Sequence, residues 1–250
     1  MNVLNSFATV IMAAGKGTRM KDPTKAKVMY EVLGKPLLYY VVETAKQLGS
    51  AKIVVIVGYQ RESVIQFLSN SFPKVEIAIQ AEQLGTGHAI MQAEDPLKYF
   101  KGDIIILSGD VPLLSIRSVQ LLLGNHKQQS ADATILTAEF TDPSGYGRII
   151  RNENGYVKRI IEHKDASEEE RKVKEINSGI YVFKKEKLFK ALKYIKPQNA
   201  QNEYYLTDVF EYFWKQKWKV SALKVSKVKE IMGVNTIDQL KEVELAMISK

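Results

Sequence analysis

A glycine-rich segment with clustered cations is the part of this sequence best suited to chemistry. Ala13-Ala-Gly-Lys-Gly-Thr-Arg-Met20 follows an apolar run, and Lys25 and Lys27 add positive charge just beyond it. Glycines let backbone N–H groups approach phosphate oxygens without a Cβ in the way. The third glycine of a dinucleotide-binding G-x-G-x-x-G is missing, and the chain contains no Walker A sequence. The segment therefore predicts a phosphate-binding loop of another class, with a plain strand-to-helix turn as the alternative.

A carboxylate stands just after a second apolar run, Ile104-Ile-Ile-Leu107, where Asp110 follows Ser108 and Gly109. If this run is a strand of a parallel sheet, its carboxyl end lies where such sheets bind ligands. A carboxylate there suits a hard cation such as Mg²⁺, which takes waters and substrate phosphates as further ligands. Considered alone, the same pattern also fits a simple turn or a helix cap.

A third segment combines an amide side chain with two glycines. Gln80-Ala-Glu-Gln-Leu-Gly-Thr-Gly-His88 begins where another apolar run ends. The Gln80 amide offers both a donor and an acceptor, which can complement one edge of a pyrimidine. A strand-to-helix turn has a similar composition, so both interpretations stay open for this segment by itself.

Alternating apolar runs and helical patterns must position these three segments. We expect strands at residues 8–13, 52–57, 75–79 and 103–107, separated by helices at residues 36–48, 62–68, 86–93 and 115–125. Strands spaced by helices form βαβ units and a parallel sheet. The expected fold is therefore α/β, with a Rossmann-like mixed, mainly parallel sheet flanked by helices.

The pattern changes after about residue 131. Asn154-Gly155, flanked by the segments Arg148–Glu153 and Tyr156–Glu162, is the strongest short-range hairpin signal. Further strands are expected at residues 131–140, 176–183 and 220–225, and helices at residues 206–215 and 236–249. No linker or internal repeat is visible, so we expect one domain over residues 1–250.

Composition narrows the class of protein further. The 250 residues include no cysteine, which excludes a disulfide framework, a thiolate metal site and a cysteine nucleophile. The net charge of +8 comes from scattered lysines, which favours a solvated surface over a nucleic-acid interface. No apolar run is long enough for a membrane span, and residues 1–8 carry no positive charge before the first apolar run. We expect a cytoplasmic protein with neither membrane nor nucleic acid as a partner.

Taken in order, these segments resemble the N-terminal uridylyltransferase region of bacterial UDP-N-acetylglucosamine pyrophosphorylase. The resemblance covers about residues 8–240, and the family's glycine-rich signature, uracil-side segment and metal aspartate segment correspond to residues 14–20, 80–89 and 109–113. Further matching segments are Gly145–Arg148, Glu162–Asp165, Glu175–Gly179, Glu203–Asp208 and Gly233–Asn235. The resemblance divides the domain into a nucleotide half to about residue 130, a sugar-phosphate half over about residues 131–235, and a closing helix at residues 236–250.

The resemblance implies that N-acetylglucosamine 1-phosphate attacks the α-phosphorus of UTP and releases pyrophosphate, with Mg²⁺ as the cofactor. These two substrates are the implied partners. The implied roles are catalysis for Arg19 and Lys27; nucleotide binding for Ala13, Ala14, Gly15, Lys16, Gly17, Gln80, Gly85 and Thr86; sugar binding for Gly147, Glu162, Asn177 and Thr207; and metal binding for Asp110 and Asn235.

The sequence also departs from the family pattern. Ala26 stands where a proline usually precedes the substrate lysine, and the segment is one residue longer, so Lys25 competes with Lys27 for that role. Ser108 replaces a common tyrosine, which alters a sugar or base contact. The alternatives are a related transferase acting on glucose 1-phosphate, a regulatory domain without turnover, and a nucleic-acid-binding module.

Family members usually continue into a left-handed β-helix that transfers acetyl groups and forms trimers. That β-helix is built from short repeats, and no hexapeptide periodicity is present in this sequence. We therefore expect uridylyl transfer without acetyl transfer, and a monomer or a weak oligomer.

Overall fold

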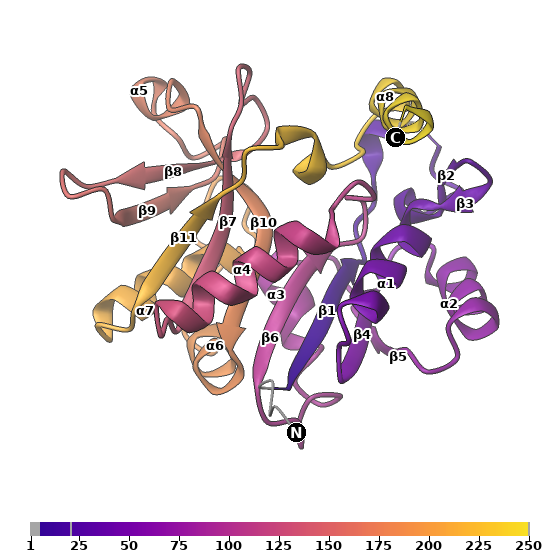
Figure 1. The fold of residues 1–250 in the computed structure, drawn as a ribbon, viewed down its shortest axis with the longest axis horizontal. Coiled ribbons are helices and arrows are strands. Elements are labelled where there is room, and N and C mark those ends of the chain that lie inside the picture. Colours follow the sequence, from indigo (N-terminus) through magenta and orange to yellow (C-terminus); the bar gives the residue numbers. More distant parts are fainter. Residues whose placement is uncertain (1–5, 21, 250) are drawn as a thin grey trace.

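One sheet organises the chain in the computed structural model, which describes residues 6–20 and 22–249. Its strands follow the spatial order β11-β7-β10-β6-β1-β4-β5 (Figure 1). Within the described residues, β10 alone runs antiparallel to its neighbours on this path. The expected mixed, mainly parallel sheet is confirmed. The strands of the path are β1 (Phe7–Ala13), β4 (Lys52–Val57), β5 (Glu76–Ile79), β6 (Asp103–Ser108), β7 (Ala133–Glu139), β10 (Glu175–Lys184) and β11 (Val220–Lys224).

A hairpin projects from this sheet beside β10 (Figure 1). It consists of β8 (Gly147–Arg151) and β9 (Val157–Ile161), and β8 pairs with β10 at its first two residues. Gly155 has a φ of 78°, which is the left-handed conformation that favours glycine in such a turn. The hairpin predicted around Asn154-Gly155 is confirmed, with somewhat shorter strands than expected.

Helices cover both faces of the sheet, so its central strands β1, β4 and β6 are buried on both sides. Val10 of β1 belongs to one apolar cluster, and the next residue, Ile11, belongs to another on the opposite face. The first face is covered by α3 (Thr86–Met91), α6 (Lys185–Leu192) and α7 (Val209–Lys215), and the second by α1 (Leu37–Gln47), α2 (Arg61–Ser71) and α4 (Ile116–Gln128).

A third apolar cluster fixes the C-terminal helix. Helix α8 (Ile237–Ile248) packs Val243 and Leu240 against Val32, which lies in a small hairpin of β2 (Glu31–Val32) and β3 (Lys35–Pro36). The closing helix is thus present, although Lys250 of the predicted range lies outside the described residues, as do residues 1–5 at the other end. No helix within residues 6–20 and 22–249 is both long and apolar enough to cross a membrane.

Several short elements escaped prediction. Helix α6 was missed because its lysines suggest a solvated face, whereas Leu188 and Leu192 bury its other face against the sheet. The helix expected at residues 206–215 divides into the 3₁₀ helix η3 (Leu206–Asp208) and α7. The remaining unpredicted elements are the short strands β2 and β3, α5 (Glu168–Arg171) and the 3₁₀ helices η1 (Thr18–Met20), η2 (Lys27–Met29) and η4 (Val228–Ile231).

Candidate functional site

A cavity opens at the point of the sheet where the strand order reverses. From β1 the chain continues to β4 and β5 on one side, and then returns to β6 on the other side of β1. In open α/β sheets, ligands bind at the carboxyl ends of the strands at such a switch point. A cavity of about 460 Å³ lies there, lined by the ends of β1 and β6, the glycine-rich loop and the segment after β5. Its lining includes all eight residues predicted to bind nucleotide: Ala13, Ala14, Gly15, Lys16, Gly17, Gln80, Gly85 and Thr86.

The two glycines of the loop have different surroundings. Gly15 is exposed, and a Cβ built on it would meet no atom of residues 6–20 and 22–249 within 4 Å. Gly17 has a φ of 60°, and a Cβ there would lie 2.6 Å from the Cβ of Lys27. Gly17 therefore allows the loop to pack directly against Lys27, while Gly15 leaves backbone facing open space.

Four polar side chains meet beside this loop. The Lys27 ammonium donates to Oδ2 of Asp110 at 2.5 Å and to Oδ1 of Asn235 at 3.0 Å. Arg19 also donates to Oδ1 of Asn235, at 2.8 Å. The two predicted catalytic cations and the two predicted metal ligands thus form one constellation. Lys25 lies elsewhere: its ammonium is 5.0 Å from the ring centroid of Tyr30, and it does not line the cavity.

Asp110 and Asn235 present oxygens that fit Mg²⁺. The amide nitrogen of Asn235 donates to the Gly233 carbonyl at 3.1 Å, which turns its oxygen toward Lys27. The Val234 N–H donates to the Asp110 carbonyl at 2.9 Å and ties the two loops together. A cation, the Lys27 ammonium, already bridges the two side-chain oxygens. A carboxylate and an amide oxygen are hard donors, and they leave most of the coordination shell to water and phosphate.

Gln80 is held with its carbonyl oxygen available. The side chain is 3% exposed, and its amide nitrogen donates to the Gly85 carbonyl at 3.1 Å and lies 3.1 Å from Nδ1 of His88. Its Oε1 has no hydrogen-bond partner in the described part of the chain. Thr86 is fixed from the other side because its hydroxyl accepts from the Leu206 N–H at 3.0 Å. An acceptor at the wall of this cavity suits a base that presents an N–H.

The four predicted sugar-binding residues form a second cluster. Gly147 of β8 is paired with Asn177 of β10. A Cβ on Gly147 would lie 3.3 Å from Oε2 of Glu162, which follows directly on β9. Oε1 of the same carboxylate accepts from the Thr207 hydroxyl at 3.1 Å. Strand pairing and packing thus bring together residues that are up to 60 positions apart, which no local sequence pattern reveals.

This second cluster is acidic. Burial raises the pKa of Glu162, and the hydrogen bond from Thr207 only partly opposes this. Burial, followed by the nearby carboxylates of Glu211, Glu162 and Asp165, raises the pKa of Asp208 to about 7. Asp208 received no role from the sequence. The sequence did point to the neighbouring Thr207, but the carboxylates that surround Asp208 come close only through tertiary contacts.

The loop before β8 connects the two clusters. A Cβ on Gly145 would lie 4.0 Å from Nη1 of Arg19. Burial raises the pKa of the Tyr146 hydroxyl, a hydrogen bond with the Gly233 backbone lowers it, and the charges of Asp110 and Arg19 also act on it. The sequence gave Tyr146 no role of its own. The sugar cluster therefore adjoins the cation constellation without lining the 460 Å³ cavity itself.

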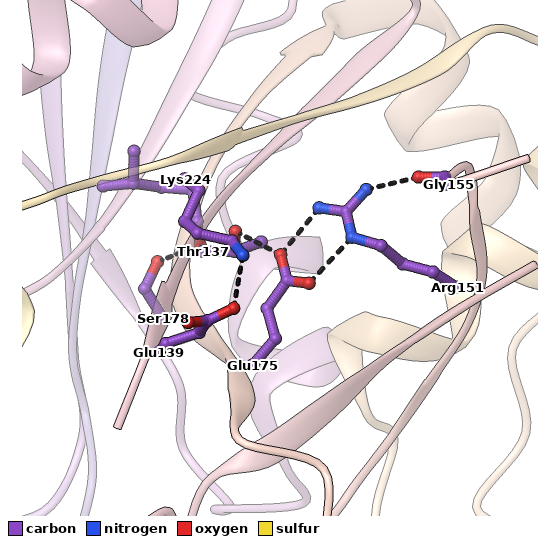
Figure 2. A network of polar contacts seen from close by, with 8 residues as sticks. Thr137, Glu139, Arg151, Gly155, Glu175, Ser178 and Lys224 are labelled. Carbon is purple, nitrogen blue, oxygen red and sulfur yellow. Dashed lines mark hydrogen bonds and ion pairs between the residues drawn. The ribbon is translucent and has the colours of Figure 1, made fainter. Parts of the chain in front are cut away.

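A partly buried ion pair anchors the hairpin that carries part of this cluster. Figure 2 shows Arg151 of β8 reaching Glu175 at the start of β10, with contacts of 2.7 Å and 2.6 Å to the two carboxylate oxygens. Thr137 donates to the same carboxylate at 2.7 Å. Burial opposes the charge, yet the hydrogen bonds from Arg151 and Thr137 prevail and lower the pKa of Glu175. The pair spans β8 and β10 beyond the point where their backbones cease to pair.

Comparison with known proteins adds independent information. The bifunctional protein GlmU of Halalkalibacterium halodurans is 46% identical over 243 residues, covering 97% of this chain and 52% of the relative. Its counterpart in Exiguobacterium sibiricum is 48% identical over 244 residues, covering 98% and 53%. The chain thus spans about half the length of the curated relatives it matches. A crystal structure of UDP-glucose pyrophosphorylase complexed with UDP-glucose superimposes with a TM-score of 0.77 at 19% identity, covering 98% of this chain and 99% of that one.

The structural match concerns the fold, which is that of sugar-nucleotide transferases. The family model for nucleotidyl transferases matches residues 8–229, a span that holds the glycine-rich loop, Gln80, Asp110 and Glu162. This chain therefore belongs to the nucleotidyl transferase family.

Proposed function

We propose that this protein joins UTP to N-acetylglucosamine 1-phosphate, producing UDP-N-acetylglucosamine and pyrophosphate with the help of Mg²⁺. The observation that carries the proposal is the Arg19–Lys27–Asp110–Asn235 constellation next to the glycine-rich loop, of which Lys27 and Asp110 line the cavity. Identities of 46% and 48% to the bifunctional protein GlmU over nearly the whole chain support the choice of substrates.

In the proposed reaction, an oxygen of the sugar phosphate forms a bond to the α-phosphorus of UTP. The bond from that phosphorus to the bridging oxygen of the β-phosphate breaks, and pyrophosphate leaves with the electron pair. The attacking oxygen is already ionised at neutral pH, so no general base is required. Catalysis then consists of positioning the substrates and neutralising crowded negative charge.

The cations of the site match this demand. Arg19 offers a planar fork that binds phosphate oxygens in pairs, whereas the Lys27 ammonium acts as a point charge. Backbone N–H groups around Gly15 face open space and can approach the phosphates directly. Mg²⁺ held by Asp110 and Asn235 would supply positive charge beside the reacting phosphates.

Gln80 is suited to recognise the base of UTP, and Glu162 is suited to recognise the amino sugar. Uracil has an N3–H that can donate to the free Oε1 of Gln80, whereas cytosine has no hydrogen at that nitrogen. Oε2 of Glu162 has no partner within residues 6–20 and 22–249 and can accept a hydrogen bond from the amino sugar.

A pyrophosphate-release assay tests this proposal. The purified chain is given UTP or CTP together with N-acetylglucosamine 1-phosphate or glucose 1-phosphate, with and without Mg²⁺. The proposal expects the highest kcat/KM for UTP with N-acetylglucosamine 1-phosphate, and no turnover after chelation of the metal. A higher kcat/KM with glucose 1-phosphate would refute the proposed sugar, and pyrophosphate release without any sugar phosphate would refute the transfer reaction.

A further inference from the structure

Arg148 is a buried cation whose hydrogen-bond partners are all neutral. Its side chain is among the largest that are fully buried, with 1% exposure. The guanidinium donates to the carbonyl of Tyr146 and, through Nε and Nη2, to the carbonyl of Arg171 at 3.3 Å. Nη2 also lies 3.4 Å from Nδ1 of His163. No carboxylate forms an ion pair with Arg148 among the residues that the structure describes.

Such an arrangement is costly, because a buried charge loses its hydration, and the only opposite charge that acts on it, Asp142, forms no ion pair with it in the described part of the chain. Burial accordingly lowers the pKa of Arg148. A methionine of similar length would fill the same space without that cost. The useful property of a guanidinium at this position is therefore the set of backbone and ring acceptors that its N–H groups hold in place.

Three chain segments meet at this guanidinium. The first is the loop before β8, through the carbonyl of Tyr146. The second is the turn after β9, through the ring of His163. The third is the end of α5, through the carbonyl of Arg171, whose own Nε donates back to the His163 carbonyl at 3.2 Å. The planar fork of an arginine can hold several acceptors in fixed directions, which a lysine cannot do.

The first two segments carry the acceptor cluster. Gly147 follows Tyr146 directly, and Glu162 directly precedes His163. The Cβ position of Gly147 lies 3.3 Å from the Glu162 carboxylate, so a small shift of either segment would change the space between them. A binding site needs its groups held to within about 0.5 Å. The backbones pair at Arg148 and Ile161, next to these two residues, and the Arg148 side chain adds a second link by reaching both Tyr146 and His163.

We propose that Arg148 is a positioning residue for the sugar of the acceptor substrate. It touches neither substrate; it fixes the loop before β8 against the turn after β9, so that Gly147 and Glu162 keep one separation. This inference rests on the proposed function, since it assumes that a sugar phosphate binds at that cluster. Loss of the Arg148 side chain should therefore weaken binding of the sugar phosphate and leave binding of the uridine nucleotide unchanged.

Lys185 provides a matched control. It is also buried, and its ammonium donates to the carbonyls of Leu97 and Phe100 at 3.0 Å and 2.6 Å, and to that of Lys98 at 3.2 Å. Unlike Arg148, it also has a carboxylate nearby, that of the exposed Glu186 at 3.5 Å. It follows the far end of β10, whereas Arg148 lies beside the beginning of that strand. Lys185 is therefore a buried cation that caps carbonyls without contact to the acceptor cluster.

The experiment compares Arg148→Met, Arg148→Lys and Lys185→Met with the wild type. For each protein, the KM of both substrates, kcat and the Tm are measured. We expect Arg148→Met to raise the KM of the sugar phosphate by about 10-fold or more, the scale of losing one well-placed interaction, with the KM of UTP changed by less than about 2-fold. Arg148→Lys retains the charge but not the planar fork, so its KM for the sugar phosphate should lie between those of the wild type and Arg148→Met. Lys185→Met should lower the Tm and leave both KM values unchanged.

Other outcomes overturn the inference. An equal rise of both KM values in Arg148→Met, or no rise in either, would show that Arg148 only supports the fold. If Arg148→Met does not fold, Arg148→Lys decides: a lowered Tm with a wild-type KM for the sugar phosphate refutes positioning. The substrate panel runs in parallel on the wild type. A wild type that prefers another sugar phosphate refutes the proposed substrate, and the comparison of KM values then uses that sugar. A wild type inactive with every sugar phosphate refutes the proposed function itself.

Discussion

The ammonium of Lys27 lies 2.5 Å from Oδ2 of Asp110, at a position where it also contacts Oδ1 of Asn235. Both side chains of this ion pair are largely buried, with exposures of 17% and 13%. The same two oxygens are the proposed Mg²⁺ ligands, so the ammonium and a metal held there would compete for them. With the metal on Asp110 and Asn235, the Lys27 ammonium would be free to pair with substrate phosphates.

Replacing Lys27 by alanine should therefore have two opposite effects. Turnover should fall by about 10²-fold or more, because a charge that stabilises the transition state is lost. The affinity of the nucleotide-free protein for Mn²⁺, measured by titration calorimetry, should increase because the competing ammonium is gone. Lys25→Ala is the control, since Lys25 lies over Tyr30, and both quantities should stay close to the wild-type values. A larger loss of turnover in Lys25→Ala would assign the substrate lysine to position 25.

Asp110→Ala should nearly abolish turnover at saturating Mg²⁺ while the protein remains folded. The carboxylate lies just beyond the end of β6 and lines the cavity, and the backbone hydrogen bond from Val234 uses the Asp110 carbonyl, which the substitution retains. Circular dichroism spectra and Tm values serve as the folding check. Normal Mg²⁺-dependent rates in this variant would remove Asp110 from the mechanism.

The two loop glycines should respond differently to alanine. In Gly17→Ala the new Cβ meets the Cβ of Lys27 at 2.6 Å in a left-handed backbone, at a cost of about 1–3 kcal/mol in stability. The Tm of the free protein should fall. In Gly15→Ala the new Cβ meets no atom within 4 Å among the residues that the structure describes, so the Tm should not change. The UTP affinity should drop, because the methyl group occupies the space through which the phosphates approach the backbone. Wild-type UTP affinity in Gly15→Ala would place the phosphates elsewhere.

Local sequence patterns predicted most of the fold but little of how the site is assembled. Apolar runs and Asn154-Gly155 located the strands and the hairpin because those signals depend on neighbouring residues. Asn235 is held near Asp110 by a hydrogen bond from the Val234 N–H to the Asp110 carbonyl. Only the family resemblance paired Asp110 with Asn235 in advance. The lysine-rich helix α6 was missed for a related reason: its apolar residues are buried only because the helix packs against the sheet, which the local sequence does not show.

Gln80→Ala should weaken discrimination between nucleotides. If Oε1 accepts from the N3–H of uracil, its loss should raise the KM of UTP by about 10-fold and affect CTP less. The measured quantity is the ratio of kcat/KM for UTP to that for CTP. Gln92→Ala is the control, because Gln92 bonds His88 and its backbone outside the cavity lining. An unchanged ratio in Gln80→Ala would mean that Gln80 does not read the base.

The acidic surroundings of Asp208 should make stability depend on pH. Burial, and then the carboxylates of Glu211, Glu162 and Asp165, raise the pKa of Asp208 from its ordinary value of 3.8 to about 7. In the window between these two values, the folded protein holds a proton that the unfolded chain has released. The free energy of unfolding therefore falls as pH rises through the window.

Asp208→Asn cannot ionise and should escape this loss of stability. Its Tm should exceed that of the wild type at pH 8, and the difference should shrink toward pH 5, as measured by thermal melts across this range. Glu153→Gln, which changes an exposed carboxylate in the hairpin turn, is the control and should show a constant difference from the wild type. A Tm difference for Asp208→Asn that is the same at pH 5 and pH 8 would show that Asp208 releases its proton at an ordinary pH in the folded protein. In that case, the acidic cluster around Glu162 is more strongly solvated than its burial implies.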